Sequence, residues 1–135
     1  MLVVFIHGFG IGFLYRLLLA GERPDRFSGL SAGTLRGQAF ATAVVLALLT
    51  LHFVEIAAFG FAYHWLGAFE RLGDAVFFSV SSYATVGFDD YAIGPRFRLI
   101  AAVEGVVGFL LIGWSTAFLV RVLVRVLTDR AEPEV

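Results

Sequence analysis

Long apolar segments are the feature that most limits how this chain can fold. Residues 39–65 are almost continuous in Ala, Val, Leu and Phe, and residues 1–20 and 97–127 are nearly as apolar. A helix needs about 20 apolar residues to cross a bilayer, so each segment can form a spanning helix. Hydrophobic residues make up 59% of the 135 residues and charged residues 16%, more apolar surface than a soluble domain of this size can use. The sequence predicts an all-α membrane protein in a lipid bilayer.

The charged and sulfur-containing residues argue against several other classes. A net charge of -1 without a basic cluster predicts no nucleic-acid partner. The chain has no cysteine, which excludes thiol chemistry and cysteine-based metal sites. No nucleophile–base pair or metal-ligand set stands out either. We therefore expect no enzymatic activity and no cofactor.

The N-terminal segment, residues 1–20, is predicted to be a transmembrane helix about 30 Å long. It lacks the charged start and the small-residue cleavage site of a signal peptide. Three glycines near its centre would allow close packing against another helix in the membrane. We expect this helix to pack on the outside of the remaining chain, facing lipid; an interfacial helix is the alternative.

The remaining chain divides into a polar linker (21–38), a membrane domain (39–127) and a polar tail (128–135). Of the ten arginines, seven lie near the linker or at the C-terminal end, and three (Arg71, Arg96 and Arg98) lie in or beside the connection between the segments 39–65 and 97–127. Because positive charge concentrates on the cytoplasmic side, the linker and tail are predicted to be cytoplasmic, and the N-terminus outside, in a multi-pass protein of the cell membrane.

A short apolar run, residues 73–83, is too brief to cross a bilayer and suits a re-entrant half-helix buried in protein. The sequence Thr-Val-Gly-Phe-Asp-Asp follows it at residues 85–90. Irregular backbone at membrane depth is tolerated only where protein covers it or where it lines a water-filled path. Carbonyl groups along such a path can replace the hydration shell of a cation, and nearby carboxylates attract cations. A plain extracellular turn with solvated carboxylates is the alternative.

This pattern resembles the pore domain of the potassium-channel family, whose order is outer helix, pore helix, T-V-G-Y-G-D filter and inner helix. The resemblance covers about residues 39–127 and extends to small bacterial ion-channel proteins with one additional N-terminal helix. It implies a homotetramer that passes monovalent cations, K⁺ first, passively along its fourfold axis. The filter residues that would bind K⁺ are Thr85, Val86, Gly87 and Phe88.

The resemblance also implies roles for residues around the filter. Phe77 and Phe78 match aromatic positions that brace it, and Asp90 matches the Asp that follows it. We expect Glu104 to hydrogen-bond the back of the filter. Filter support is assigned to Phe77, Phe78, Ser81 and Glu104, and the gating-hinge candidates are Gly105, Gly108 and Gly113, for which close packing is an equal alternative.

One position departs from the family pattern, because Asp89 replaces the second filter glycine. Aspartate tolerates left-handed backbone at a cost of roughly 1–2 kcal/mol, so the outermost ion site is expected to be altered. Asp89 and Asp90 would form a carboxylate ring at the outer mouth. With this replacement, Na⁺ is a second candidate ion in addition to K⁺. A non-conducting or regulatory membrane subunit with a degenerate filter is the alternative function.

His52 and Glu55 are three residues apart and share one helix face in the middle of a predicted span. A charge there is costly, so we expect structural hydrogen bonding, with His7 as a candidate partner; pH sensing is the alternative. The spacing differs from the H-E-x-x-H of zinc proteases. With three histidines in the chain, the sequence gives little support for a metal site.

Overall fold

The computed structural model describes residues 2–20, 35–87 and 93–128, which are helical apart from short connections. In chain order the elements are α1 (Leu2–Ala20), α3 (Leu35–Trp65), α4 (Leu72–Tyr83), a short 3₁₀ helix η1 (Pro95–Phe97) and α5 (Arg98–Thr128). No strand occurs within these described ranges. The predicted all-α class is therefore confirmed.

The helix boundaries differ from the predicted ones mainly at the start of α3. This helix begins at Leu35, four residues inside the segment that we predicted to be linker. No proline interrupts residues 35–38, and Arg and Gln are good helix formers, so the helix continues beyond its apolar part. At the other boundary, Phe97 belongs to the 3₁₀ helix that Pro95 opens, and α5 follows it directly.

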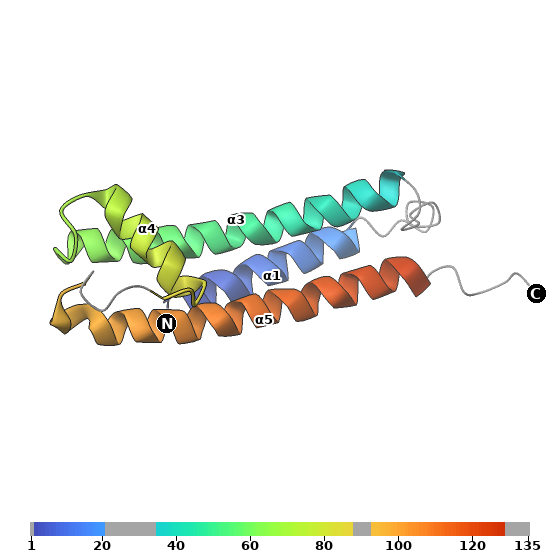
Figure 1. Cartoon of the computed structure of the whole chain (residues 1–135). Coiled ribbons are helices and arrows are strands. Elements are labelled where there is room, and N and C mark those ends of the chain that lie inside the picture. The colour runs from blue at the N-terminus through green and yellow to red at the C-terminus, as the bar shows by residue number, and fades with distance from the viewer. Residues whose placement is uncertain (1, 21–34, 88–92, 129–135) are drawn as a thin grey trace, which may run out of the picture.

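The two longest helices, α3 and α5, run antiparallel (Figure 1). Each of the two shorter helices, α1 and α4, lies along one half of this pair. α1 lies along the half of the pair that contains the start of α3, while α4 slants across the other half. The start of α1 and the end of α4 meet near the middle of the pair. α4 therefore ends deep inside the domain, as a re-entrant half-helix must.

Each half of the α3–α5 pair has its own core. In one half, apolar side chains of α1, α3 and α5 interlock: Ile11, Val44, Leu48, Phe118 and Val122. In the other half, α4 packs against α3 and the segment that leads into α5, through Tyr63, Ala75, Phe78, Ile93 and Phe97. These apolar side chains are buried where α4 contacts α3 and the segment before α5, and their burial holds α4 in place.

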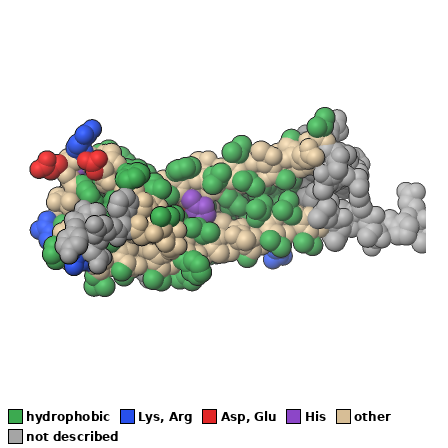
Figure 2. Space-filling view, viewed as in Figure 1, with side chains coloured by type: hydrophobic (Ala, Val, Ile, Leu, Met, Phe, Trp, Pro, Cys, Tyr) green, Lys and Arg blue, Asp and Glu red, His purple; other side chains and the backbone are tan. Residues whose placement is uncertain are grey.

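The outer surface is suited to lipid rather than water. Among the described residues, three helices are long and apolar enough to cross a membrane, with spans at Leu2–Leu19, Gly37–Trp65 and Pro95–Val124. Hydrophobic side chains cover the length of the molecule, whereas most of the visible charged side chains gather at the end where α3 leads into α4 (Figure 2). The protein is therefore a multi-pass membrane protein.

Candidate functional site

Helix α4, predicted to be the pore helix, ends in a tight turn that directs the chain away from the helix axis. The Thr85 amide donates to the Ser82 carbonyl at 3.0 Å, and the Val86 amide donates to the Ser81 carbonyl at 3.0 Å. This pair of bonds defines a Schellman motif, in which the residue after the C-cap takes a left-handed conformation. That residue is Thr85, with a φ of 57°.

A β-branched residue is an unusual choice for this position, which glycine normally occupies. The left-handed conformation costs an ordinary residue roughly 1–2 kcal/mol. Gly87, two residues further on, also has a positive φ, of 80°, which glycine adopts without penalty. Strained backbone persists where function requires a particular geometry, which makes residues 85–87 a candidate site.

Three of the predicted filter residues, Thr85, Val86 and Gly87, lie in this exposed segment directly after α4. The Val86 side chain is 78% exposed in the single chain. The other predicted filter and mouth residues, Phe88, Asp89 and Asp90, lie outside the described residues.

Helix α5 passes very close to the end of α4. A Cβ atom on Gly105 would stand 3.2 Å from the Ser82 carbonyl oxygen, and one on Gly108 would meet the backbone of Tyr83. The Ser82 hydroxyl also donates to the Ala101 carbonyl of α5 at 2.8 Å. Close packing therefore explains the glycines at 105 and 108.

The third hinge candidate, Gly113, has a different environment. Apart from its own helix backbone, no atom of the described residues lies within 4 Å of a Cβ built on it. Helix α5 is continuous through all three glycines. The structure thus separates Gly113 from the two glycines that pack against α4.

Glu104 is fully buried and holds α4 against α3. It accepts hydrogen bonds from the Tyr63 hydroxyl at 2.6 Å and from the Ser79 hydroxyl at 2.5 Å. These two donors lie on α3 and α4, whereas we expected Glu104 to bond the back of the filter itself. Glu104 on α5 therefore links α3 and α4, whose end leads into the predicted filter segment.

The other predicted support residues act in different ways. The Ser81 carbonyl accepts the Val86 amide and, at 3.3 Å, the Gly87 amide, so it contacts the predicted filter directly. Phe78 is buried and packs edge-to-face against Tyr63, with ring centroids 5.4 Å apart. Phe77 has 64% of its surface exposed in the single chain. Phe78 therefore braces the pore helix against α3.

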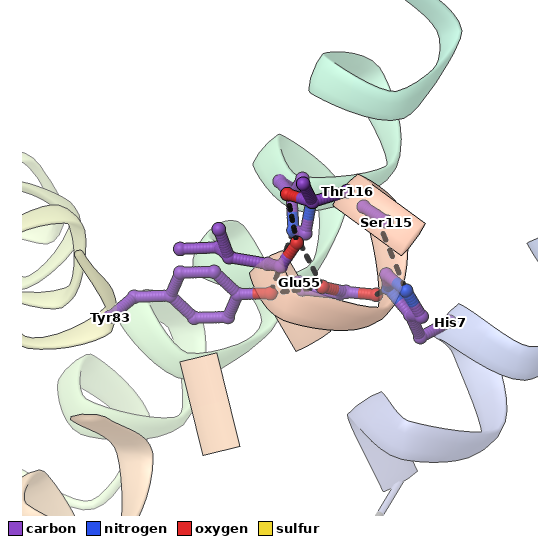
Figure 3. Close-up of polar contacts among 7 residues, drawn as sticks. His7, Glu55, Tyr83, Ser115 and Thr116 are labelled. Atoms are coloured by element: carbon purple, nitrogen blue, oxygen red, sulfur yellow. Dashed lines mark hydrogen bonds and ion pairs between the residues drawn. The ribbon is translucent and has the colours of Figure 1, made fainter. Parts of the chain in front are cut away.

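A second buried polar cluster lies where α1, α3 and α4 meet (Figure 3). The His7 ring nitrogen Nδ1 lies 2.9 Å from one carboxylate oxygen of Glu55, and the Tyr83 hydroxyl donates to the other. His52 Nδ1 lies 2.9 Å from the Tyr83 hydroxyl oxygen. The expected bond between Glu55 and His7 is confirmed. The cluster connects α1 to the last residue of the pore helix.

Sequence reasoning missed the two tyrosines that complete these clusters. Tyr63 and Tyr83 are both 1% exposed, and each donates its hydroxyl to a buried glutamate. A tyrosine inside an apolar segment needs a hydrogen-bond partner when it is buried. The glutamates in the neighbouring spans need partners as well. Matching the tyrosines to these glutamates could therefore have identified both clusters from the sequence.

Two long apolar helices with a half-helix that enters between them and ends at membrane depth define a pore-type membrane protein. The sequence model of a family described as ion channel matches residues 51–125, more than half of the chain. The chain belongs to this family of potassium-channel-like pores with two spanning helices. The matched region begins within α3 and ends within α5, so α4 lies inside it and α1 outside it. No curated protein and no solved structure is significantly similar to the chain.

Proposed function

We propose that the protein forms a homotetrameric channel through which K⁺ crosses the membrane passively, with Na⁺ as a second candidate ion. The carbonyl groups of Thr85, Val86, Gly87 and Phe88 coordinate the ion on the fourfold axis. The Thr85 hydroxyl stands at the inner end, and Asp89 and Asp90 form the outer mouth. The transport requires no catalysis and no cofactor other than the permeant ion.

The observation that carries this proposal is the exposed backbone that follows α4. Residues 84–87 are exposed in the single chain, near the middle of the α3–α5 pair. Lipid cannot hydrogen-bond such backbone, so protein or water must cover it. Four copies arranged around an axis supply both, because each filter segment then faces the others and a hydrated path.

Exposed apolar side chains on α5 support assembly in the same way. Beside the end of α4, this helix exposes Val103, Val106, Phe109 and Leu110 in the single chain. In a tetramer of this family an inner helix contacts its neighbours and borders the pore. These side chains are suited to both environments.

The direction of α4 supports cation binding. Its C-terminal end lies at the depth of Glu55 and Gly108, close to the middle of the long helices. A helix C-terminus carries a partial negative charge of about half an elementary charge. Four such ends directed at one axis lower the electrostatic energy of a cation in the centre of the membrane.

The test is ion flux into liposomes that contain the purified full chain, with K⁺, Na⁺ and Rb⁺ compared in parallel. We expect K⁺ flux that Gly87→Ala abolishes or strongly reduces, because alanine is strained at a φ of 80°. Gly73→Ala is the matched control, since other parts of the described chain leave open space within 4 Å of a Cβ at that position. Equal loss of flux in both variants would contradict the filter assignment.

The Asp89→Gly variant separates the two candidate functions. If the native protein conducts K⁺ and Na⁺ equally and Asp89→Gly favours K⁺, the aspartate has weakened selectivity in a working channel. If only Asp89→Gly conducts, the native chain is the non-conducting subunit with a degenerate filter. Cross-linking in mild detergent tests the assembly, and products no larger than dimers would exclude the fourfold filter.

A further inference from the structure

Three side chains of the central polar cluster have the composition of a metal site. His7, His52 and Glu55 each offer one ligand atom, and these atoms all lie within 4.8 Å of one another. His7 comes from α1, and the other two come from α3. The tertiary structure therefore brings His7 to the His52–Glu55 pair, although His7 and Glu55 are 48 positions apart in the sequence.

One separation between these atoms matches that around a tetrahedral ion, and a second is shorter. Metal–ligand bonds of about 2.0–2.2 Å place neighbouring ligand atoms about 3.3–3.5 Å apart. His52 Nδ1 lies 3.4 Å from Glu55 Oε2, and His7 Nδ1 lies 2.9 Å from Glu55 Oε1. The hydroxyl oxygen of Tyr83, 2.9 Å from His52 Nδ1, is a fourth candidate donor atom in the same place. A small widening of these contacts makes room for an ion.

The surroundings of the two histidines also suit a metal. The second ring nitrogen of His7 lies 3.4 Å from the Ser115 hydroxyl, which gives it the outer hydrogen-bond partner that ligating histidines usually have. His7 and Glu55 are fully buried, whereas 13% of the His52 side chain is exposed, which provides a side of approach. Two imidazoles and a carboxylate favour Zn²⁺ and similar transition ions over Mg²⁺ or Ca²⁺, which prefer all-oxygen sites.

We infer that His7, His52 and Glu55 bind one divalent transition-metal ion of the Zn²⁺ class, with the Tyr83 oxygen as its fourth neighbour. Such an ion replaces the hydrogen bonds of Glu55 and links α1 and α3 to the last residue of the pore helix. Tyr83 is two residues from Thr85, so the ion would hold α1 against the base of the candidate filter. This inference does not depend on whether the protein conducts ions.

The test uses Co²⁺ as a spectroscopic substitute for Zn²⁺ on the purified full chain in detergent. We expect one Co²⁺ per chain with the strong visible absorption of a tetrahedral site, displaced by Zn²⁺. His52→Ala and Glu55→Gln should each weaken binding at least tenfold. His64→Ala is the matched control, because the remaining histidine lies exposed at the end of α3, with Nδ1 3.1 Å from the Phe69 carbonyl oxygen. Absence of Co²⁺ binding, or equal loss in His64→Ala, would overturn the inference.

A second measurement needs no variant and guards against misfolding of the substituted chains. X-ray absorption of the Zn²⁺-loaded native protein counts the imidazole ligands of the bound ion. Two imidazoles with oxygen ligands are expected, and one or none would overturn the site. Zn²⁺ should also raise the unfolding temperature of the native protein, since an ion bound only to the folded state stabilises it.

Discussion

Gly108 of α5 lies directly against the backbone of Tyr83, the last residue of the pore helix. A Cβ atom at position 108 would stand 3.0 Å from the Tyr83 carbonyl carbon and 2.9 Å from its Cγ atom. Real Cβ atoms do not approach backbone this closely, so one of the two helices would have to move. The glycine at this position is required by packing, whatever it contributes to gating.

We expect Gly108→Ala to destabilise the folded protein by about 1–3 kcal/mol, the usual cost of overfilling a packed contact. Gly113→Ala, on the same helix, should leave stability unchanged or raise it by up to about 1 kcal/mol, since alanine favours helix and none of the described residues crowds a Cβ at this position. Unfolding temperatures in detergent would measure the difference. Equal destabilisation would place Gly113 in a contact between copies of the chain.

Thr85 offers a way to separate backbone strain from side-chain chemistry. Thr85→Gly should stabilise the end of α4 by about 1 kcal/mol, because glycine adopts a φ of 57° freely. Thr85→Ala keeps the strain and removes only the hydroxyl. If the hydroxyl contributes to ion binding, both variants should alter flux, whereas only Thr85→Gly should unfold at a higher temperature. Unchanged flux in both would remove Thr85 from the filter.

Glu104 accepts hydrogen bonds from two hydroxyl groups that have no access to water. Glu104→Ala leaves the Tyr63 hydroxyl without its acceptor, at a cost of about 1–3 kcal/mol, whereas the Ser79 hydroxyl can still donate to the Ile56 carbonyl at 2.9 Å. Tyr63→Phe removes one donor and should cost about 1 kcal/mol. Glu70→Gln, at an exposed acid, is the control and should be neutral within about 0.5 kcal/mol. A neutral Glu104→Ala would mean that water reaches the cluster.

Membrane orientation can be tested cleanly because the chain contains no cysteine. Leu35 at the start of α3 is 85% exposed, and Glu70 lies exposed at the opposite end of the domain. From the arginine distribution we expect Glu70→Cys to react with a membrane-impermeant thiol reagent in intact cells. Leu35→Cys should react only after permeabilisation. The reverse result would invert the proposed orientation, with the linker and tail outside.

Much of the fold could be predicted because each signal is local. An apolar segment predicts a spanning helix wherever it occurs, and residues 73–83 were too short to cross the membrane, which indicated a half-helix. Predicted and observed boundaries differ by four residues at the start of α3, since good helix formers extend a helix past its apolar part. The bond between His7 and Glu55 was anticipated because a buried charge in a membrane needs a partner.

By itself, the sequence determined the class of the protein, the number of spanning helices and the position of the half-helix, because backbone groups in lipid must be satisfied within each segment. Only the tertiary structure decided which helices share each half of the α3–α5 pair and which side chains meet between them. The Tyr83 hydroxyl lies between His52 and Glu55. Glu104 accepts a hydrogen bond from Ser79 of the pore helix. Gly108 has no side chain, so the Tyr83 backbone can pack directly against it. These contacts join residues far apart in the chain, and they depend on how helices cross, which no single segment encodes.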